Sequence, residues 1–156
     1  NVQGDEPFFN PYDLKKLINF SQKNPKEIVN GYTEIRDEKL YRNSSIPKVI
    51  FDKKNNLLYI SRGQIPSSKD KKFNKAWRQV CAYSFPKKLL KIFSQNKKKT
   101  PIESIEDIEI LRFLELGLRV KMIKMSNKSL AVDNYEDLEK AKVYLKYKKL
   151  WIYYII

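Results

Sequence analysis

Two acidic segments near opposite ends of the chain carry residue types that could bind a divalent cation. The first is Gln3-Gly4-Asp5-Glu6-Pro7, and the second, from Ala131 to Leu138, contains Asp133. Mg²⁺ prefers oxygen ligands and is often bound by one or two carboxylates together with substrate phosphates. If Val2 ends a strand of an open α/β sheet, Asp5 lies beyond its carboxyl end, where such sheets bind ligands. Together, Asp5 and Asp133 predict a site for Mg²⁺ and a triphosphate.

Each segment also has a purely structural interpretation. Gly, Asp and Pro are ordinary turn residues, so the first segment could be a polar turn before a helix. Asp133 is a preferred N-cap residue, and Glu136 three positions later would complete a capping box. The chemical interpretation therefore depends on the two carboxylates acting together.

The elements that must position these carboxylates alternate between helix and strand. Asn10 as N-cap and Pro11 at the first helical position predict a helix that ends near Pro25. Two strand-forming runs flank a polar Lys-Lys-Asn-Asn link, which predicts a β-hairpin. The alternation favours an α/β sandwich over a bundle or a barrel. In chain order we expect strand 27–35, loop 36–46, hairpin strands 48–52 and 57–62, loop 63–75, strand 78–85, helix 87–93, a helix from 100, strand 119–125 and a final helix within 130–149.

The helix after Thr100 has the strongest end signals. Thr100 and Glu103 form a capping box, and Gly117 provides a C-terminal stop. Its expected buried stripe is Ile102, Ile105, Ile108 and Leu111. If they take no part in a site, its three carboxylates form a solvated acidic face of the helix. They are Glu103, Glu106 and Glu109. In the first helix, the residues expected to face inward are Leu14, Leu17 and Ile18. In the last helix they are Leu138, Ala141 and Leu145, and we expect Asp133 or Asn134 to be the N-cap of that helix.

The composition describes a globular chain with a large positive charge. Of its 156 residues, 42% are hydrophobic and 13% aromatic, enough for one packed core. Lys and Arg number 32 against 18 Asp and Glu, so the net charge is +14 and nucleic acid is a competing partner. Only 6 of these cations are Arg, the side chain that reads phosphates and guanine edges bidentately. We therefore expect most of the Lys side chains to solvate the surface.

The scarcity of histidine and cysteine excludes several kinds of site. The chain has no His, which argues against zinc sites and against Ser-His or Cys-His nucleophile pairs. Its single Cys81 excludes a disulfide framework and fits a reducing compartment. The apolar terminus 151–156 is far shorter than the ~20 residues of a membrane helix. We expect a soluble protein.

Five segments resemble, in order, motifs of the 3-deoxy-manno-octulosonate cytidylyltransferase (CMP-Kdo synthetase) family. They are NVQGDEP, KVIFDKKNNLLYISRGQIP, RQVCAYSF, TPIESIEDIEILRFLELG and VDNYEDLEKAK. They are similar to the family's signature segment, its hairpin ending in Ser-Arg-x-x-Ile-Pro, its Arg-His-x-x-x-Tyr strand, its Pro-Leu-Glu-x-x-Glu helix and its Val-Asp-Thr-Pro-Glu-Asp-Leu terminus. The resemblance covers about residues 1–145.

This resemblance implies a three-layer, Rossmann-like α/β sheet of the nucleotide-diphospho-sugar-transferase type, with an inserted β-hairpin dimerisation region. Residues 1–149 would be the C-terminal part of one cytidylyltransferase domain, with a dimerisation and sugar-binding insertion at about 46–85 and an apolar tail at 150–156. The family's nucleotide-binding half, which precedes the signature segment, is missing here. We therefore expect the chain alone to be inactive.

The resemblance also implies roles for particular residues. Asp5 and Asp133 match the carboxylates that hold Mg²⁺ while the anomeric hydroxyl of Kdo attacks the α-phosphorus of CTP. The positions that match sugar-acid contacts are Gln3, Arg62, Gln79, Tyr83 and Glu109. The implied protein is a cytoplasmic homodimer that acts on CTP and a 3-deoxy-ulosonic acid for lipopolysaccharide synthesis, with neither nucleic acid nor membrane as partner.

Two departures from the family pattern leave the sugar open. Gln79 stands where the family commonly has His, and Ile110 stands where it has Gln. Both positions belong to the implied sugar pocket. A cytidylyltransferase for an amino-substituted Kdo or for a sialic-type acid is therefore an alternative, and a basic nucleic-acid-binding module is a second alternative.

Overall fold

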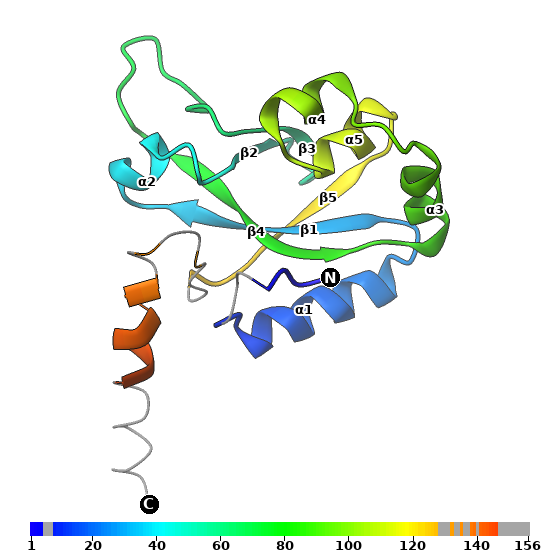
Figure 1. Ribbon diagram of the computed structural model, residues 1–156, viewed down its shortest axis with the longest axis horizontal. Coiled ribbons are helices and arrows are strands. Elements are labelled where there is room, and N and C mark those ends of the chain that lie inside the picture. The colour runs from blue at the N-terminus through cyan, green and yellow to red at the C-terminus, as the bar shows by residue number, and fades with distance from the viewer. Residues whose placement is uncertain (5–7, 128–131, 133–134, 136–137, 140, 147–156) are drawn as a thin grey trace, which may run out of the picture.

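The computed structural model describes residues 1–4, 8–127, 132, 135, 138–139 and 141–146. Within these residues, five strands form one mixed sheet in the order β3-β2-β4-β1-β5 (Figure 1). The strands are β1 (Ile28–Ile35), β2 (Lys48–Phe51), β3 (Leu57–Ser61), β4 (Ala76–Ser84) and β5 (Val120–Lys124). The helices are α1 (Pro11–Lys23), α2 (Glu38–Arg42), α3 (Lys87–Gln95), α4 (Pro101–Glu106) and α5 (Ile110–Glu115).

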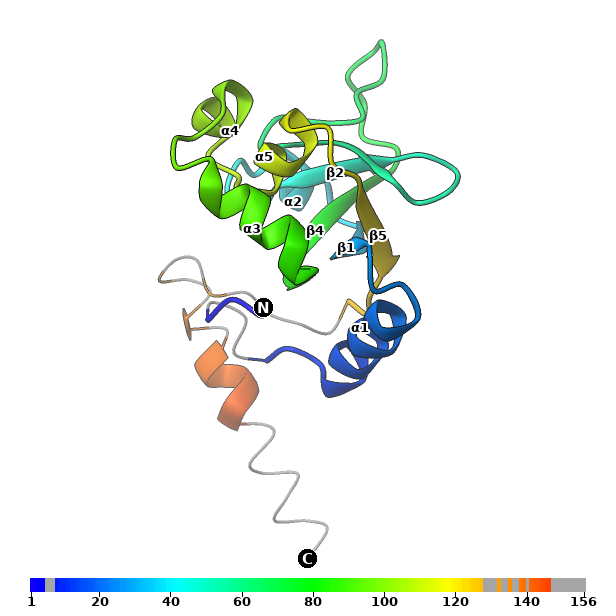
Figure 2. The same ribbon diagram turned by 90° about the vertical axis from the view of Figure 1, so that its right-hand side faces the viewer.

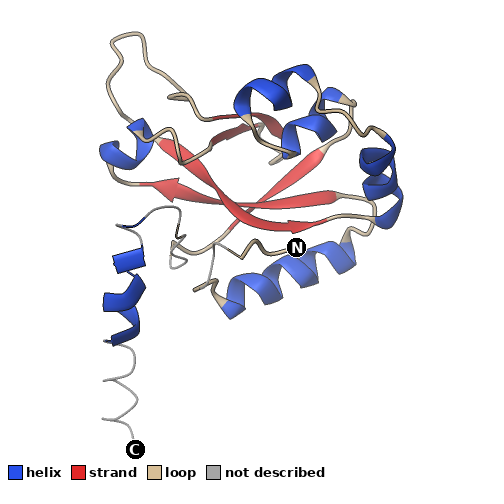
Figure 3. Ribbon diagram, in the orientation of Figure 1, coloured by secondary structure: helices blue, strands red, loops and turns tan. Residues whose placement is uncertain are grey.

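The sheet is strongly curved (Figure 3). The middle strand β4 pairs antiparallel with β1, β1 pairs parallel with β5, and β2 and β3 form an antiparallel hairpin. The turn of this hairpin reaches the strand at the other end of the order. There the Met122 N–H donates to the Asn55 carbonyl oxygen at 2.8 Å, and Asn56 forms a bridge with Lys121. The hairpin turn thus contacts β5, although among the described strands β3 itself pairs only with β2 in the strand order.

The two larger apolar clusters lie on opposite faces of the sheet, because successive side chains of a strand point to opposite sides. On one face, Leu17 of α1 packs with Val29 of β1 and Val80 of β4. On the other face, α5 packs with Ile28 and with strand residues that include Val120. Figure 2 shows α1 on one side of the sheet and α3, α4 and α5 on the other. The predicted three-layer α/β fold is confirmed.

Local signals predicted the first helix and the hairpin correctly. The Asn10 side chain accepts a hydrogen bond from the Tyr12 N–H, and α1 begins at Pro11 as expected. The inward face of α1 is narrower than predicted: Leu17 is buried, whereas Leu14 and Ile18 are 37% and 47% exposed. The predicted loop 36–46 contains α2, which is capped by Asp37 and buries Tyr41. A helix this short carries too little periodicity to be recognised in the sequence.

The helix predicted from Thr100 to Gly117 is broken in two, so its predicted stripe is partly wrong. Asp107 ends α4 with φ of 53°, in the left-handed region, and α5 then starts at Ile110. The break turns Ile105 out to 83% exposure, and Ile102 is 39% exposed. The residues after the break that were expected in the core, Ile108 and Leu111, are buried.

Of the predicted final helix within 130–149, the structure describes residues 132, 135, 138–139 and 141–146. The expected caps Asp133 and Asn134 lie outside the described residues. Ala141 is buried as predicted, but Leu138 and Leu145 are 39% and 46% exposed, so their inward orientation was wrong. Helical spacing shows which side chains share a face, not whether another element covers that face. Among the described residues, no helix has the length and apolar character needed to cross a bilayer.

Gly31 sits at an irregularity of the β1–β4 pairing and has no room for a side chain. A Cβ there would overlap the Met125 Sδ atom and lie 3.2 Å from the Val80 Cβ atom. We predict that Gly31→Ala lowers the free energy of unfolding by about 1–3 kcal/mol, because the core must shift to accept the methyl group. Urea denaturation measures the loss. Gly4→Ala is the control, since nothing lies within 4 Å of a Cβ at that position, and an equal loss there would contradict the prediction.

Candidate functional site

A pocket of about 290 Å³ lies at the carboxyl end of β4, where four segments meet. The segment 1–3 runs beside β4: the Gln3 N–H donates to the Cys81 carbonyl oxygen at 3.1 Å, and the Tyr83 N–H donates to the Asn1 carbonyl oxygen at 2.8 Å. The end of β4, α3 and the start of α5 complete the walls. The lining residues are Asn1, Gln3, Tyr83, Phe85, Leu90, Phe93, Glu109, Ile110 and Phe113.

Aromatic rings form one continuous wall of this pocket. Tyr83 stacks on Phe85 with ring centroids 5.5 Å apart, Phe85 on Phe113 at 5.4 Å, and Phe93 on Phe113 at 4.8 Å. The Arg112 guanidinium packs over the outer ring, 4.0 Å from the Phe93 centroid. Pockets for small molecules are typically apolar cavities with a few placed polar groups. These rings supply the apolar part.

The polar groups of the pocket come from three different elements. Gln3 belongs to the N-terminal segment, Tyr83 to β4 and Glu109 to the turn before α5. Glu109 has the only charged side chain among the described residues that line the pocket. Its carboxylate can accept hydrogen bonds from hydroxyl groups, and it would pair with a cationic group. This arrangement suits a polyhydroxylated ligand.

Three of the predicted sugar-acid contacts therefore converge, and two do not line this pocket. Gln3, Tyr83 and Glu109 are lining residues. Gln79 is buried in the sheet, where its Nε2 donates to the Asn30 Oδ1 atom at 3.0 Å. Arg62 follows β3, and its Nε donates to the Glu106 carbonyl oxygen at 2.7 Å.

The predicted metal ligands, Asp5 and Asp133, both lie outside the described residues. Within the part of the chain that is described, no group of three or more Asp, Glu or Cys side chains is arranged to hold a metal ion. The Mg²⁺ site stays a prediction.

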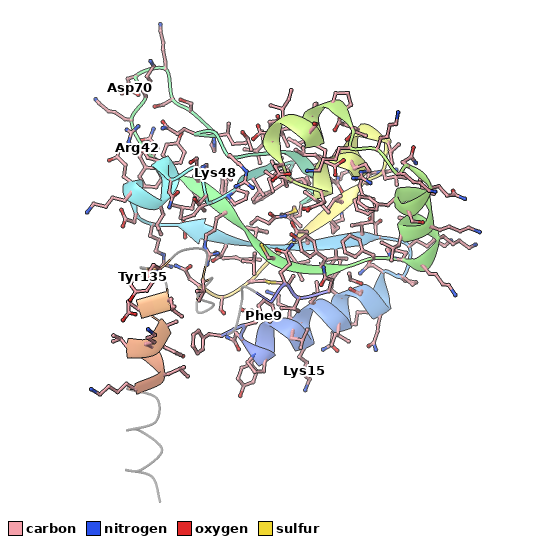
Figure 4. All side chains as sticks on the ribbon, in the orientation of Figure 1. Phe9, Lys15, Arg42, Lys48, Asp70 and Tyr135 are labelled. Carbon is pink, nitrogen blue, oxygen red and sulfur yellow. The ribbon has the colours of Figure 1, made fainter. Side chains whose placement is uncertain are left out.

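A shallower hollow of about 400 Å³ follows one side of α1. Its walls are the side chains Tyr12, Lys15, Lys16, Asn19, Phe20 and Lys23. Lys15 points away from the sheet (Figure 4), as we expected of most Lys side chains. Because this hollow is a strip along a single helix, we assign no site to it.

A buried ion pair that no local sequence pattern predicts fixes α4 against α5, and hence the wall that carries Glu109. Arg112 donates from Nε and Nη2 to the two carboxylate oxygens of Glu103, at 2.6 and 2.5 Å. The Glu103 side chain is fully buried and that of Arg112 is 10% exposed. Glu115 accepts from the Ile102 and Glu103 N–H groups, both at 3.0 Å. The alternative interpretation of these carboxylates as a solvated acidic face therefore does not hold for Glu103.

The pKa values of these carboxylates predict acid sensitivity. Burial raises the pKa of Glu103, but hydrogen bonds from Arg112 and Thr100 outweigh it and hold the pKa below the ordinary value of 4.5. A lowered folded-state pKa stabilises the fold above the ordinary value, and this contribution is lost as pH falls through the lowered one. We expect the free energy of unfolding, from urea titrations, to fall between about pH 5 and about pH 3. Glu103→Gln should flatten this dependence, and an unchanged slope would contradict the assignment.

The fold and the pocket define a class of protein. Ligands of open α/β sheets bind beyond the carboxyl ends of strands, and the pocket at the end of β4 combines an aromatic wall with polar groups from separate elements. This is the architecture of a mixed α/β domain with a candidate small-molecule site. The family follows from sequence: the chain belongs to the cytidylyltransferases, whose family model matches residues 1–150.

Three curated relatives narrow the comparison. A 3-deoxy-manno-octulosonate cytidylyltransferase of Christiangramia forsetii is 38% identical over 146 residues, 91% of this chain and 58% of the relative. The Protochlamydia amoebophila enzyme of the same name is 33% identical over 93% of this chain and 57% of the relative. An 8-amino-3,8-dideoxy-manno-octulosonate cytidylyltransferase of Shewanella halifaxensis is 30% identical over 88% of this chain and 57% of the relative. This chain thus spans less than three fifths of these relatives' length.

A solved structure supports the same fold. It is described as CMP:2-keto-3-deoxy-manno-octonic acid synthetase complexed with CTP, and it superposes with a TM-score of 0.84 at 24% sequence identity. The match covers 95% of this chain and 61% of that chain.

Proposed function

We propose that this chain supplies the sugar-acid-binding part of a cytidylyltransferase that transfers CMP from CTP to 3-deoxy-manno-octulosonate (Kdo) for lipopolysaccharide synthesis. The observation that carries the proposal is the convergence of Gln3, Tyr83 and Glu109 in one pocket. These residues lie far apart in the sequence, and each matches a family position for the sugar acid. Their hydrogen-bonding groups would orient the sugar hydroxyls, while the aromatic wall excludes water from one side of the ring.

The transfer joins the anomeric oxygen of the sugar to the α-phosphorus of CTP and breaks the bond to pyrophosphate. We propose that Asp5 and Asp133 hold Mg²⁺ beside the triphosphate, because two carboxylates offer the oxygen ligands that this ion prefers. Bound Mg²⁺ supplies charge neutralisation and promotes ionisation of the attacking hydroxyl. Asp5 follows the pocket residue Gln3 by two positions in the sequence. The chain's own contribution in the pocket is to bind and orient the sugar.

The test joins this chain to a nucleotide-binding half. The Christiangramia forsetii relative provides that half, since it is the most similar of the three compared. Pyrophosphate release should require CTP, Mg²⁺ and Kdo together, and the 156-residue chain alone should be inactive. A joined protein that is folded but inert with Kdo and with a panel of related sugar acids would refute the proposal.

A second candidate substrate is 8-amino-3,8-dideoxy-manno-octulosonate, which the Shewanella halifaxensis relative is named for. The observation that favours it is Ile110, which lines the pocket where the family has Gln. Because the Ile110 side chain cannot form a hydrogen bond, the neighbouring Glu109 carboxylate can pair with a hydrogen-bond donor of the ligand. The ammonium group of the amino sugar would add charge to that pairing. Turnover of the joined enzyme with Kdo and the amino sugar in competition shows which of the two is preferred. Ile110→Gln should shift the preference toward Kdo if the amino sugar is the substrate.

We also propose a cytoplasmic homodimer that forms through the segment 46–85. Strand β3 is an edge of the sheet in the strand order, and Leu58 on it is 60% exposed. Exposed edge strands are sites where another chain can add. Light scattering should give twice the chain mass, and Leu58→Lys should shift the protein to monomer. A monomeric parent protein would refute the dimer.

The cytoplasmic location is proposed from the single cysteine, Cys81, which fits a reducing compartment.

A further inference from the structure

The Glu106 side chain does not line the pocket, yet its carboxylate joins α4 to the end of β3. Its Oε1 accepts from the Ser61 hydroxyl at 2.6 Å and from the Tyr59 hydroxyl at 3.2 Å, and its Oε2 accepts from the Arg62 N–H at 2.9 Å. Burial raises the pKa of Glu106, but these donors outweigh it and hold the pKa below its usual value. The carboxylate is therefore ionised at neutral pH, and hydrogen bonds to an ionised group are the strong ones.

Arg62 is held through both its backbone and its side chain. Its guanidinium donates to the carbonyl oxygens of Glu106 at 2.7 Å, Asp107 at 3.2 Å and Ser44 at 3.4 Å. Its own carbonyl oxygen accepts from the Lys48 ammonium at 2.7 Å. Lys48 is fully buried near the α2 end of the sheet (Figure 4). The start of the Ser-Arg-Gly-Gln-Ile-Pro loop is thus fixed from two directions.

The same carboxylate stands next to the turn that leads into the pocket. Asp107 has φ of 53° and ends α4, and its side chain pairs with Lys99. Glu109 and Ile110, two and three residues further on, line the pocket. Because so few residues separate them, the position of Glu106 constrains where the Glu109 carboxylate lies.

We propose that Glu106 is a positioning residue of the sugar-acid site. It holds the end of β3 against the turn between α4 and α5, and in this way it fixes the pocket wall formed by Glu109 and Ile110. It acts through these neighbours and does not touch the sugar. The inference rests on the proposed function, since it assigns the sugar to this pocket.

The test is Glu106→Gln in the joined enzyme, with Glu106→Ala beside it. We expect the KM for the sugar acid to rise roughly tenfold in Glu106→Gln, because one charge-assisted acceptor is lost, and to rise further in Glu106→Ala. The KM for CTP should stay within about twofold of the parent value. Ser61→Ala removes a single donor, so it should give a smaller rise in the same direction and serves if the Glu106 variants fold poorly.

Two control variants separate positioning from general stability. Asp52→Asn weakens the far turn of the same hairpin, where Asp52 accepts from the Lys54 and Asn56 N–H groups, both at 2.8 Å. It should lower the melting temperature without changing either KM. Ile105→Ala alters the 83% exposed neighbour of Glu106 and should change neither property. A sugar KM in Glu106→Gln equal to that of Asp52→Asn would overturn the proposal.

A readout on the chain itself keeps this inference separate from the proposed function. In ¹⁵N NMR spectra of the 156-residue chain, Glu106→Gln should shift the Arg62 amide and Nε–H signals and the amides of Glu109 and Ile110. Shifts confined to Tyr59 and Ser61 would overturn the positioning role. An inert joined parent enzyme would count against the proposed function alone, because the NMR comparison does not depend on turnover.

Discussion

Arg112→Leu should lower the free energy of unfolding by about 3–5 kcal/mol, because it leaves the buried Glu103 carboxylate without its partner. Glu103 has no exposed side-chain surface, and both of its oxygens accept from the Arg112 guanidinium. The substitution also removes the bond from Arg112 Nη1 to the Asn96 carbonyl oxygen at 2.9 Å. It also removes the packing of the guanidinium over the Phe93 ring, 4.0 Å from the ring centroid.

A double-mutant cycle tests whether the pairing itself is responsible. Glu103→Leu in the Arg112→Leu background should recover much of the lost stability, because replacing both members of a buried ion pair by apolar groups is often near neutral. Urea denaturation of the four proteins gives the coupling free energy. Arg119→Leu, which changes an exposed Arg, is the control. If the double variant were as unstable as the sum of the two single variants, the ion pair would not be the source of the loss.

The elements that could be predicted from the sequence are those governed by contacts within a few residues. Asn10 caps α1 through the Tyr12 N–H, and Thr100 with Glu103 forms the expected capping box. The β2–β3 hairpin follows from strand-forming runs around a polar turn. In each case the hydrogen bond that defines the element joins residues close in sequence, so the pattern alone is enough.

The helix break at Asp107 could not be predicted in this way, because tertiary contacts decide it. A continuous helix satisfies the local signals from Thr100 to Gly117 equally well. The break brings Arg112 onto Glu103 and directs the Glu106 carboxylate to Ser61, 45 residues away in sequence. A signal was nevertheless present: a Glu that caps its own helix and lies near an Arg is a candidate for burial.

The sequence likewise predicts some residues of the pocket and not others. Motif positions identified Gln3, Tyr83 and Glu109, which do converge. The same motifs included Arg62 and Gln79, whose observed partners are backbone carbonyls and Asn30. The aromatic wall was missed altogether, since Phe85, Phe93 and Phe113 come from three elements whose packing no local pattern specifies.

Asp5→Asn and Asp133→Asn, each made in the joined enzyme, should lower kcat by at least about 100-fold at saturating CTP, Mg²⁺ and sugar acid. Each change removes a negative charge that we propose acts on the metal beside the transferring phosphoryl group, where electrostatic stabilisation is worth most. Mg²⁺ dependence should shift to higher concentration, because a neutral amide is a poorer ligand than a carboxylate. Pyrophosphate release against Mg²⁺ concentration measures both effects.

Asparagine is the informative replacement because it separates the chemical interpretation from the structural one. Asn is as good an N-cap as Asp, so Asp133→Asn keeps a helix cap, and Asn is equally suited to the turn that Asp5 would otherwise form. Both variants should therefore melt within a few degrees of the parent while losing turnover. Glu6→Gln and Glu136→Gln remove neighbouring charges and should keep most of the activity. Full turnover in Asp5→Asn or Asp133→Asn would show that these residues are a turn and a cap, and the metal assignment would fail.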